Sequence, residues 1–353
     1  MIKLLFIPLL FAALFCNANA RTAVQTFSPT DNRVQYFGRA DFSNPARPRL
    51  WAPGAYIVFN FQGKDCEVLL DDEELYGTTH NYLEIVVDGK ASRIKTTTKH
   101  DTLKIANNLT NGKHTVIICK DTEAAIGYVA LTGINCEALL PPPAAPLRKI
   151  EYIGDSITCG SASDLSTPCG TGQWYDQHNA WLSYGAVTAR NLSAQYHISA
   201  VSGIGLMHSC CGMKQTMSDV YDRVNFSNDS LKWDFKKYQP DVVTVCLGQN
   251  DGIQDSVAFC KAYILFIDKL RQYYPKADIV CLNSPMGNEE LNNALKKYME
   301  AVNNYYRNHG DQHVSHYFFN KRYDHGCGTH PDTSEHRQIA TELTAYLKKL
   351  KGW

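Results

Sequence analysis

A run of prolines in the middle of the chain is the feature that most constrains its fold. Residues 139–146 read Leu-Leu-Pro-Pro-Pro-Ala-Ala-Pro. Successive prolines fix φ and remove backbone N–H donors, so this segment continues neither a helix nor a central strand and favours a stiff polyproline II spacer. A chain of 353 residues is also long enough for more than one domain. We therefore expect a linker at 139–148 between a first domain at 21–138 and a second at 149–353.

Before the linker, short runs rich in β-branched and aromatic residues predict strands at 56–61, 82–87 and 114–118. The Asp-Gly pair at 88–89 and the Asn-Gly pair at 111–112 are typical of tight β-turns. No helical periodicity of any length occurs in this half. The pattern predicts an antiparallel β-sandwich of the jelly-roll kind.

After the linker, strand-like and helix-like segments alternate. Near-continuous apolar runs predict strands at 150–153, 196–200, 241–247 and 279–282. Apolar residues at helical spacing predict an intervening helix whose buried face carries Phe259, Tyr263, Phe266, Ile267 and Leu270. This alternation predicts an α/β domain with a parallel, flavodoxin-like sheet covered by helices on both faces.

The N-terminus has the layout of a secretory signal peptide. A single lysine precedes an apolar run at 4–15, and small residues follow at 17–20. We expect cleavage near Ala20 and a secreted protein, extracellular or periplasmic. Cys16 suggests a lipoprotein instead, but the bulky Phe15 before it disfavours that alternative. No later stretch is long and apolar enough to span a membrane.

Composition excludes several classes of partner and cofactor. Formal net charge is zero, so no global field attracts nucleic acid or an anionic membrane, and neither is an expected partner. Twelve cysteines are present, eleven after cleavage at Ala20, and none form CxxC pairs. We therefore expect no metal and no other cofactor. Cys159 and Cys169, which flank one loop, are the best candidates for a disulfide.

A serine stands where the first strand of the second domain ends. The segment 154–158 reads Gly-Asp-Ser-Ile-Thr, and catalytic groups of open α/β sheets gather at the carboxyl ends of strands. A purely structural helix cap is the alternative explanation. Position 158 is threonine, so this is not the Gly-x-Ser-x-Gly turn of α/β-hydrolases. The segment instead resembles the GDSL block of the SGNH esterases.

The other blocks of that family have counterparts in the expected order. They are Ser-Gly-Ile-Gly at 202–205, Gly-Gln-Asn-Asp at 248–251 and Thr-His-Pro at 329–331. The resemblance implies that Ser156 is the nucleophile and His330 its general base. It also implies an oxyanion hole made by the backbone N–H groups of Ser156 and Gly203 and the side-chain amide of Asn250.

The block around His330 departs from the family pattern. The usual layout has an aspartate three residues before the histidine, and here that residue is Cys327. Asp324 and Asp332 are near in sequence but at the wrong spacing. We therefore expect a Ser–His dyad in which a backbone carbonyl accepts the imidazole N–H.

The two-domain order resembles carbohydrate esterase family 2 over essentially the whole mature chain. That resemblance implies removal of acetyl groups from polysaccharides such as xylan and mannan, so the expected partner is an acetylated polysaccharide or oligosaccharide. Candidate substrate contacts are Asp155, Trp174 and Asp251. Two alternatives stay open, namely an esterase or thioesterase for other small acyl esters, and a carbohydrate-binding protein with a vestigial esterase site.

Overall fold

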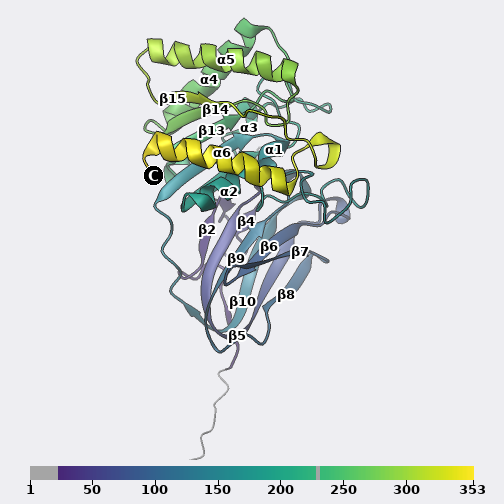
Figure 1. Cartoon of the computed structure of the whole chain (residues 1–353). Helices are drawn as coiled ribbons and strands as arrows, with labels where there is room; N and C mark the ends of the chain where they lie inside the picture. Colours follow the sequence, from purple (N-terminus) through teal and green to yellow (C-terminus); the bar gives the residue numbers. More distant parts are fainter. Residues whose placement is uncertain (1–22, 228–230) are drawn as a thin grey trace, which may run out of the picture.

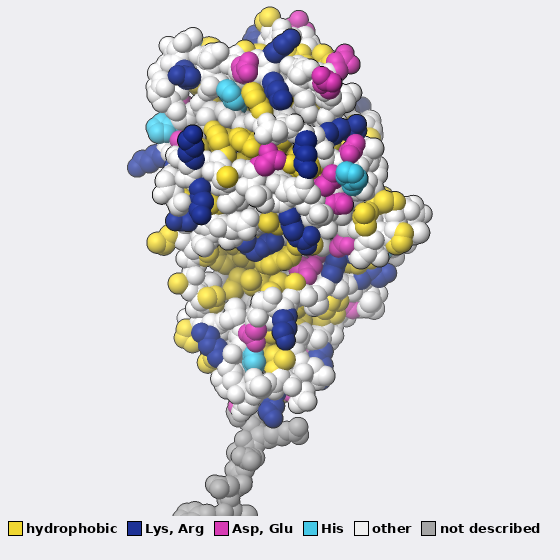
Figure 2. Space-filling view, viewed as in Figure 1, with side chains coloured by type: hydrophobic (Ala, Val, Ile, Leu, Met, Phe, Trp, Pro, Cys, Tyr) yellow, Lys and Arg dark blue, Asp and Glu magenta, His cyan; other side chains and the backbone are white. Residues whose placement is uncertain are grey.

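A computed structural model describes residues 23–227 and 231–353, which form an elongated molecule of two stacked parts (Figure 1). The expected signal peptide lies outside the described residues. Within the described ranges, no helix combines the length and apolar character needed to cross a membrane. The face seen in Figure 2 carries basic and acidic side chains intermixed, in keeping with a formal net charge of zero.

The N-terminal part is an antiparallel β-sandwich. Its longest strand, β5 (Tyr56–Asp72), pairs through its first half with β9 (Gly112–Lys120) and through its second half with β8 (His100–Ala106). Strand β10 (Val129–Leu140) runs antiparallel along both halves of β5, with two register shifts. The remaining strands are β1 (Gln25–Phe27), β2 (Gln35–Phe37), β3 (Ala40–Asp41), β4 (Arg49–Leu50), β6 (Tyr82–Val87) and β7 (Lys90–Lys95).

The alternation of side chains along these strands builds the core of the sandwich. Phe59 and Phe61 on β5 are fully buried, as are Leu83 and Ile85 on β6. Successive side chains of a strand point to opposite faces, so residues two apart enter the same core. The predicted strands and the sandwich architecture are confirmed.

The C-terminal part is a five-stranded parallel sheet. Its strand order is β12-β11-β13-β14-β15, and every neighbouring pair is parallel. In chain order this is 2-1-3-4-5, the order of flavodoxin-like folds. The predicted sheet is confirmed, with strands at β11 (Arg148–Gly154), β12 (Ala194–Ala200), β13 (Val242–Cys246), β14 (Asp278–Leu282) and β15 (Val314–Tyr317).

Helices cover both faces of this sheet (Figure 1). On β14, Ile279 and Cys281 join the core beneath α4 (Ser256–Tyr273) and α5 (Glu289–Asn308). Val280 and Leu282 join the opposite core beneath α2 (Tyr184–Asn191) and α6 (Thr333–Lys351). A strand buried on both faces explains the near-continuous apolar runs. Short helical turns complete the domain at α1 (Ser156–Cys159) and α3 (Met217–Val220).

The proline-rich segment connects the two parts without a strand or helix of its own. Strand β10 continues to Leu140 and β11 begins at Arg148, so residues 141–147 form the connection. It is fixed at both ends, because the Asn60 amide donates to the Pro141 carbonyl and the Gln195 amide donates to the Pro146 carbonyl, each at 2.6 Å.

A buried ion pair joins the two domains. Arg39 of the sandwich lies 2.9 Å from Glu151 of β11, and their side chains are 1% and 0% exposed. The Arg39 guanidinium also donates to the carbonyls of Tyr221 and Arg223. A buried charge is tolerated only when it is paired and hydrogen-bonded. This contact therefore fixes how the sandwich sits against the parallel sheet.

We expect Arg39→Ala to lower the free energy of unfolding by about 3–5 kcal/mol, because it leaves the Glu151 carboxylate buried without its cation. Urea denaturation followed by tryptophan fluorescence measures the change. The matched control is Arg47→Ala, whose pair with Asp71 involves a 53% exposed arginine and for which we expect at most about 1 kcal/mol. Equal losses in the two variants would contradict the role of Arg39.

Candidate active site

The first strand of the parallel sheet delivers Ser156 to its carboxyl edge. Strand β11 ends at Gly154, where a Cβ would lie 2.0 Å from Thr158 Oγ1, so the tight turn requires glycine. Asp155 caps α1 by accepting a backbone N–H through Oδ1 at 3.1 Å. Ser156 is the first helical residue, so its own N–H has no partner within the helix.

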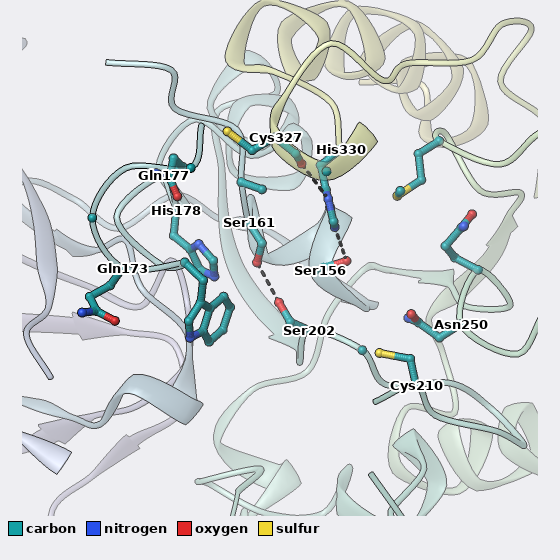
Figure 3. A pocket seen from close by; sticks show the side chains of 18 of the residues that line it. Ser156, Ser161, Gln173, Gln177, His178, Ser202, Cys210, Asn250, Cys327 and His330 are labelled. Atoms are coloured by element: carbon teal, nitrogen blue, oxygen red, sulfur yellow. Dashed lines mark hydrogen bonds between the residues drawn. The ribbon is translucent and has the colours of Figure 1, made fainter. Parts of the chain in front are cut away.

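Ser156 and His330 are in hydrogen-bond contact (Figure 3). Ser156 Oγ lies 2.8 Å from His330 Nε2, and His330 Nδ1 lies 3.1 Å from the Cys327 carbonyl oxygen. A carbonyl only accepts, so Nδ1 carries the proton and the Nε2 lone pair faces the serine hydroxyl. The pair is thus a serine that donates to a neutral imidazole.

Within residues 23–227 and 231–353, no carboxylate contacts the imidazole of His330. Asp324 pairs with Arg322 at 3.2 Å, and Asp332 caps α6 by accepting a backbone N–H at 2.8 Å. Burial lowers the pKa of His330, and the hydrogen bond to the Cys327 carbonyl opposes that shift. A carbonyl orients the ring as a carboxylate would, but it carries no net charge.

A disulfide holds the residue that supplies this carbonyl. Cys327 is bonded to Cys169, and the two residues are 158 positions apart in sequence. The predicted Cys159–Cys169 pair is wrong. The loop after α1 brings Cys169 to the loop that contains Cys327, whereas Cys159 is a buried free thiol beside the Glu123 carboxylate.

The backbone N–H groups of Ser156 and Gly203 have no hydrogen-bond partner among the described residues. Gly203 has a φ of +81°, and a Cβ there would lie 2.8 Å from Cys210 Sγ, so both conformation and space require glycine. Cys210 forms a second disulfide with its neighbour Cys211. This loop therefore packs closely around the Gly203 amide.

Asn250 lies beside the same site but already has partners. Its Nδ2 donates to the Ile204 carbonyl at 2.9 Å and lies 3.3 Å from Asp155 Oδ2. Burial raises the pKa of Asp155 to about 7. An anion bound here would compete with the longer of the two Asn250 contacts.

Asp155 and Asp251, two of the three expected substrate contacts, do not line the cavity. Asp155 is fully buried and caps α1. Asp251 accepts three backbone N–H groups of residues 206–208 at 2.6–2.9 Å, which occupies both carboxylate oxygens. These two carboxylates therefore support loops, because neighbouring N–H groups already donate hydrogen bonds to them.

Trp174, the third expected contact, stands at a cavity of about 610 Å³ above Ser156 and is 55% exposed. Tyr175 and Trp181 of the same loop are buried instead. Figure 3 shows His178 and Gln173 on one side of the cavity and Asn250 with Cys210 on the other. The polar side chains of the lining are Ser156, Ser161, Thr171, Gln173, Gln177, His178, Ser202, Gln249, Asn250 and His330.

Several of these lining residues, including Ser161, Gln173 and Gln177, were not predicted from the sequence. They come from loops without a motif, so only the fold brings them together. Among the described residues, Asp324, His325 and Glu335 could supply three metal-ligating atoms within 4.8 Å of one another. Those residues do not line the cavity.

Two family models match the chain. Residues 36–143 match the model described as "Carbohydrate esterase 2 N-terminal", and residues 152–337 match the model of the "GDSL-like Lipase/Acylhydrolase family". The first match falls on the sandwich and the second on the parallel sheet with its helices.

Individual relatives agree with these matches. The chain is 32% identical to "Cellulase/esterase CelE" of Acetivibrio thermocellus over 93% of this chain, but it spans only 41% of that protein's length. It is 27% identical to an "Acetylxylan esterase / glucomannan deacetylase" of Cellvibrio japonicus, over 99% of this chain and all of that protein. A solved family two carbohydrate esterase from Clostridium thermocellum, in complex with cellohexaose, superposes with a TM-score of 0.84 at 31% identity, covering 91% of this chain and 99% of that one.

The fold and the Ser156–His330 contact, together with these matches, define a serine carboxylic-ester hydrolase of the GDSL type. More narrowly, the chain belongs to carbohydrate esterase family 2. The prediction of a two-domain carbohydrate esterase is thereby confirmed.

We expect Cys169→Ser to lower the kcat of ester hydrolysis by about tenfold, because the Cys327 carbonyl that orients His330 loses its covalent anchor. Initial rates on 4-nitrophenyl acetate measure the effect. Cys260→Ser, at a partly buried free thiol on α4, is the control and should retain activity. Full activity of Cys169→Ser at unchanged KM would contradict the expectation.

Proposed function

We propose that the protein is an exported esterase that removes acetyl groups from acetylated plant polysaccharides such as xylan and mannan. The observation that carries this proposal is the 2.8 Å contact between Ser156 Oγ and His330 Nε2 at a cavity with an exposed tryptophan. The names of the relatives, an acetylxylan esterase / glucomannan deacetylase among them, support acetyl esters of polysaccharides as the substrate class.

In the first half of the reaction, Ser156 Oγ attacks the acetyl carbonyl while His330 Nε2 takes the hydroxyl proton. A new C–O bond forms, and the carbonyl oxygen becomes an anion. The intermediate then expels the sugar alkoxide, which receives its proton from His330. The products of this half are the free sugar hydroxyl and an acetyl-Ser156 ester.

In the second half, His330 takes a proton from a water molecule, which attacks the acetyl-Ser156 carbonyl. Collapse of the second tetrahedral intermediate breaks the bond to Ser156 Oγ and returns the proton to it. Acetic acid leaves and loses its proton to solvent to become acetate, and the free enzyme is restored. The Cys327 carbonyl keeps the proton on His330 Nδ1 throughout, so that only Nε2 exchanges protons.

The oxyanion of each intermediate would be held by the N–H groups of Ser156 and Gly203. Both donors are backbone groups fixed by the turns that contain them, so they need little reorganisation during the reaction. Asn250 would add a third donor by giving up its 3.3 Å contact with Asp155. Loss of one such donor typically costs about 10²–10³ in turnover.

The substrate would lie across the Trp174 side of the cavity. An exposed indole offers a flat apolar face for a sugar ring, and the amide of Gln173 nearby can hydrogen-bond its hydroxyls. These groups suit a sugar better than a long acyl chain, which disfavours a lipid esterase or thioesterase. Retention of Ser156 and His330 in contact disfavours a binding protein with a vestigial site.

Export rests on the sequence at 1–20 and on the disulfides. Disulfides persist in oxidising compartments and are rare in the cytosol. The Cys169–Cys327 bond therefore supports function outside the cytoplasm, and the sequence at 1–20 supports export with cleavage near Ala20.

We expect Ser156→Ala and His330→Ala each to lower kcat by on the order of 10⁴-fold or more, since nucleophile and base act as one unit. Acetate release from 4-nitrophenyl acetate and from acetylated xylan measures this. Asp324→Asn is the matched control and should keep most activity, because Asp324 pairs with Arg322. An active Ser156→Ala would exclude the serine mechanism. Activity on the nitrophenyl ester alone would exclude the polysaccharide substrate.

We expect kcat/KM to rise with pH through a midpoint below 6.5 and then stay level to about pH 8. Burial lowers the pKa of His330 below its ordinary value of 6.5, so the imidazole is already the neutral base near neutrality. Initial rates on 4-nitrophenyl acetate between pH 4.5 and 8.5, corrected with Ser156→Ala, test this. A midpoint above 7 would show that a charge near His330 outweighs its burial.

A further inference from the structure

The carboxylate of Glu123, in the sandwich domain, contacts two residues that line the cavity of the proposed active site. Glu123 directly precedes the short turn η2 (Ala124–Ile126), and both it and His178 are 1% exposed. Its Oε2 accepts from the Ser202 N–H at 2.7 Å, and its Oε1 lies 3.2 Å from His178 Nε2. Both of these partners belong to the α/β domain, and both line the cavity.

The contact with Ser202 acts on the loop that presents Gly203. Ser202 immediately precedes Gly203, and peptide units are planar, so fixing one unit limits the orientation of the next. The hydroxyl of Ser202 is held as well, 2.8 Å from that of Ser161 (Figure 3). Glu123 therefore helps to aim the Gly203 N–H, one of the proposed oxyanion donors.

The contact with His178 acts on the opposite wall of the cavity. The His178 ring packs edge-on against Trp174, with 4.8 Å between ring centroids. A second residue of the sandwich, Arg93 of β7, donates to the carbonyls of Asp176 and His178 at 2.7 and 2.8 Å. The sandwich thus supports the wall at both the side chain and the backbone of His178.

Glu123 is itself held firmly. The buried Lys120 donates to the Glu123 carbonyl at 3.1 Å and to the Thr122 carbonyl at 2.7 Å. Burial opposes ionisation of Glu123, but the hydrogen bonds from His178 and the Ser202 N–H outweigh it and lower the pKa of Glu123. An ionised, rigid carboxylate accepts stronger hydrogen bonds than a neutral group.

The charge of Glu123 also acts on His330. Burial lowers the pKa of His330, and the negative charge of Glu123 is among the influences that raise it. A nearby anion favours the imidazolium that forms when Ser156 attacks. Among the described residues no carboxylate contacts the ring, and His178 lowers the pKa of His330 and so opposes the effect of Glu123.

We propose that Glu123 is a positioning residue of the esterase reaction, which orients the Ser202–Gly203 turn and His178 and makes the sandwich domain part of the active site. This inference rests on the proposed serine mechanism. In this role the Glu123 carboxylate of the sandwich accepts hydrogen bonds from residues of the α/β domain. The role requires no cofactor.

The test compares full-length wild type, Glu123→Ala and Glu123→Gln on 4-nitrophenyl acetate. We expect Glu123→Ala to lower kcat by about 10- to 100-fold, less than direct loss of an oxyanion donor, with KM changed less than about threefold. Glu123→Gln keeps an oxygen acceptor for the Ser202 N–H, so it should recover part of kcat. It lacks the negative charge, so its kcat/KM midpoint should move to lower pH.

The matched control is Glu73→Ala. Like Glu123, Glu73 is a carboxylate that accepts a backbone N–H, in this case from Tyr128, and it accepts the indole N–H of Trp51 as well. Trp51 and Tyr128 both belong to the sandwich. We expect its kcat to stay within about twofold of wild type. Near-UV circular dichroism and thermal unfolding of every variant separate lost packing from lost positioning.

The outcomes distinguish this inference from the proposed function. If Ser156→Ala stays active, the serine mechanism itself fails. If wild type is active and Ser156→Ala is not, but folded Glu123→Ala keeps wild-type kcat, only the role of Glu123 fails. If Glu123→Ala does not fold, the role of Glu123 is tested by Glu123→Gln alone. A Glu123→Gln variant with wild-type kcat and an unchanged midpoint of kcat/KM against pH would overturn the inference.

Discussion

The register of the parallel sheet is the constraint on which the site depends. Gly154 at the end of β11 pairs with Ala200 of β12 on one side and with Cys246 of β13 on the other. Three strands therefore end at one level, and the loops that follow them begin side by side. Ser156, Gly203 and Asn250 each lie within a few residues of these ends, so ladder hydrogen bonds formed deep in the domain set their spacing.

His330 is positioned by a loop rather than by the end of a strand. It belongs to no strand, and it is positioned by the loop before α6, where the Gly326 N–H donates to the His330 carbonyl and the Cys327 N–H donates to the Ala162 carbonyl at 2.9 Å. The Cys169–Cys327 bond adds a covalent tie to the cavity wall. The ring is oriented by the Cys327 carbonyl, which these contacts hold in place.

The two domains share both their packing and, on our proposal, their chemistry. The Arg39–Glu151 pair fixes the sandwich against β11, and Glu123 and Arg93 extend that contact to the loops around the cavity. Charged groups buried at a domain boundary are costly unless fully paired. Such contacts therefore specify one relative orientation of the domains, and a precise active site needs that orientation.

The sequence by itself determined the two architectures, part of their strands, the helix at α4 and the order of the catalytic blocks, because strand alternation, helical spacing and the residues at strand ends are local properties. It also indicated that a backbone carbonyl accepts the imidazole N–H, since no acid stood at the usual spacing, and the structure identified that carbonyl as the one of Cys327. Only the tertiary structure decided the partner of Cys169, the use of Asp251 as a loop support, and the approach of Glu123 to Ser202. Each of these depends on distances between segments far apart in the chain, which packing sets and local sequence does not encode.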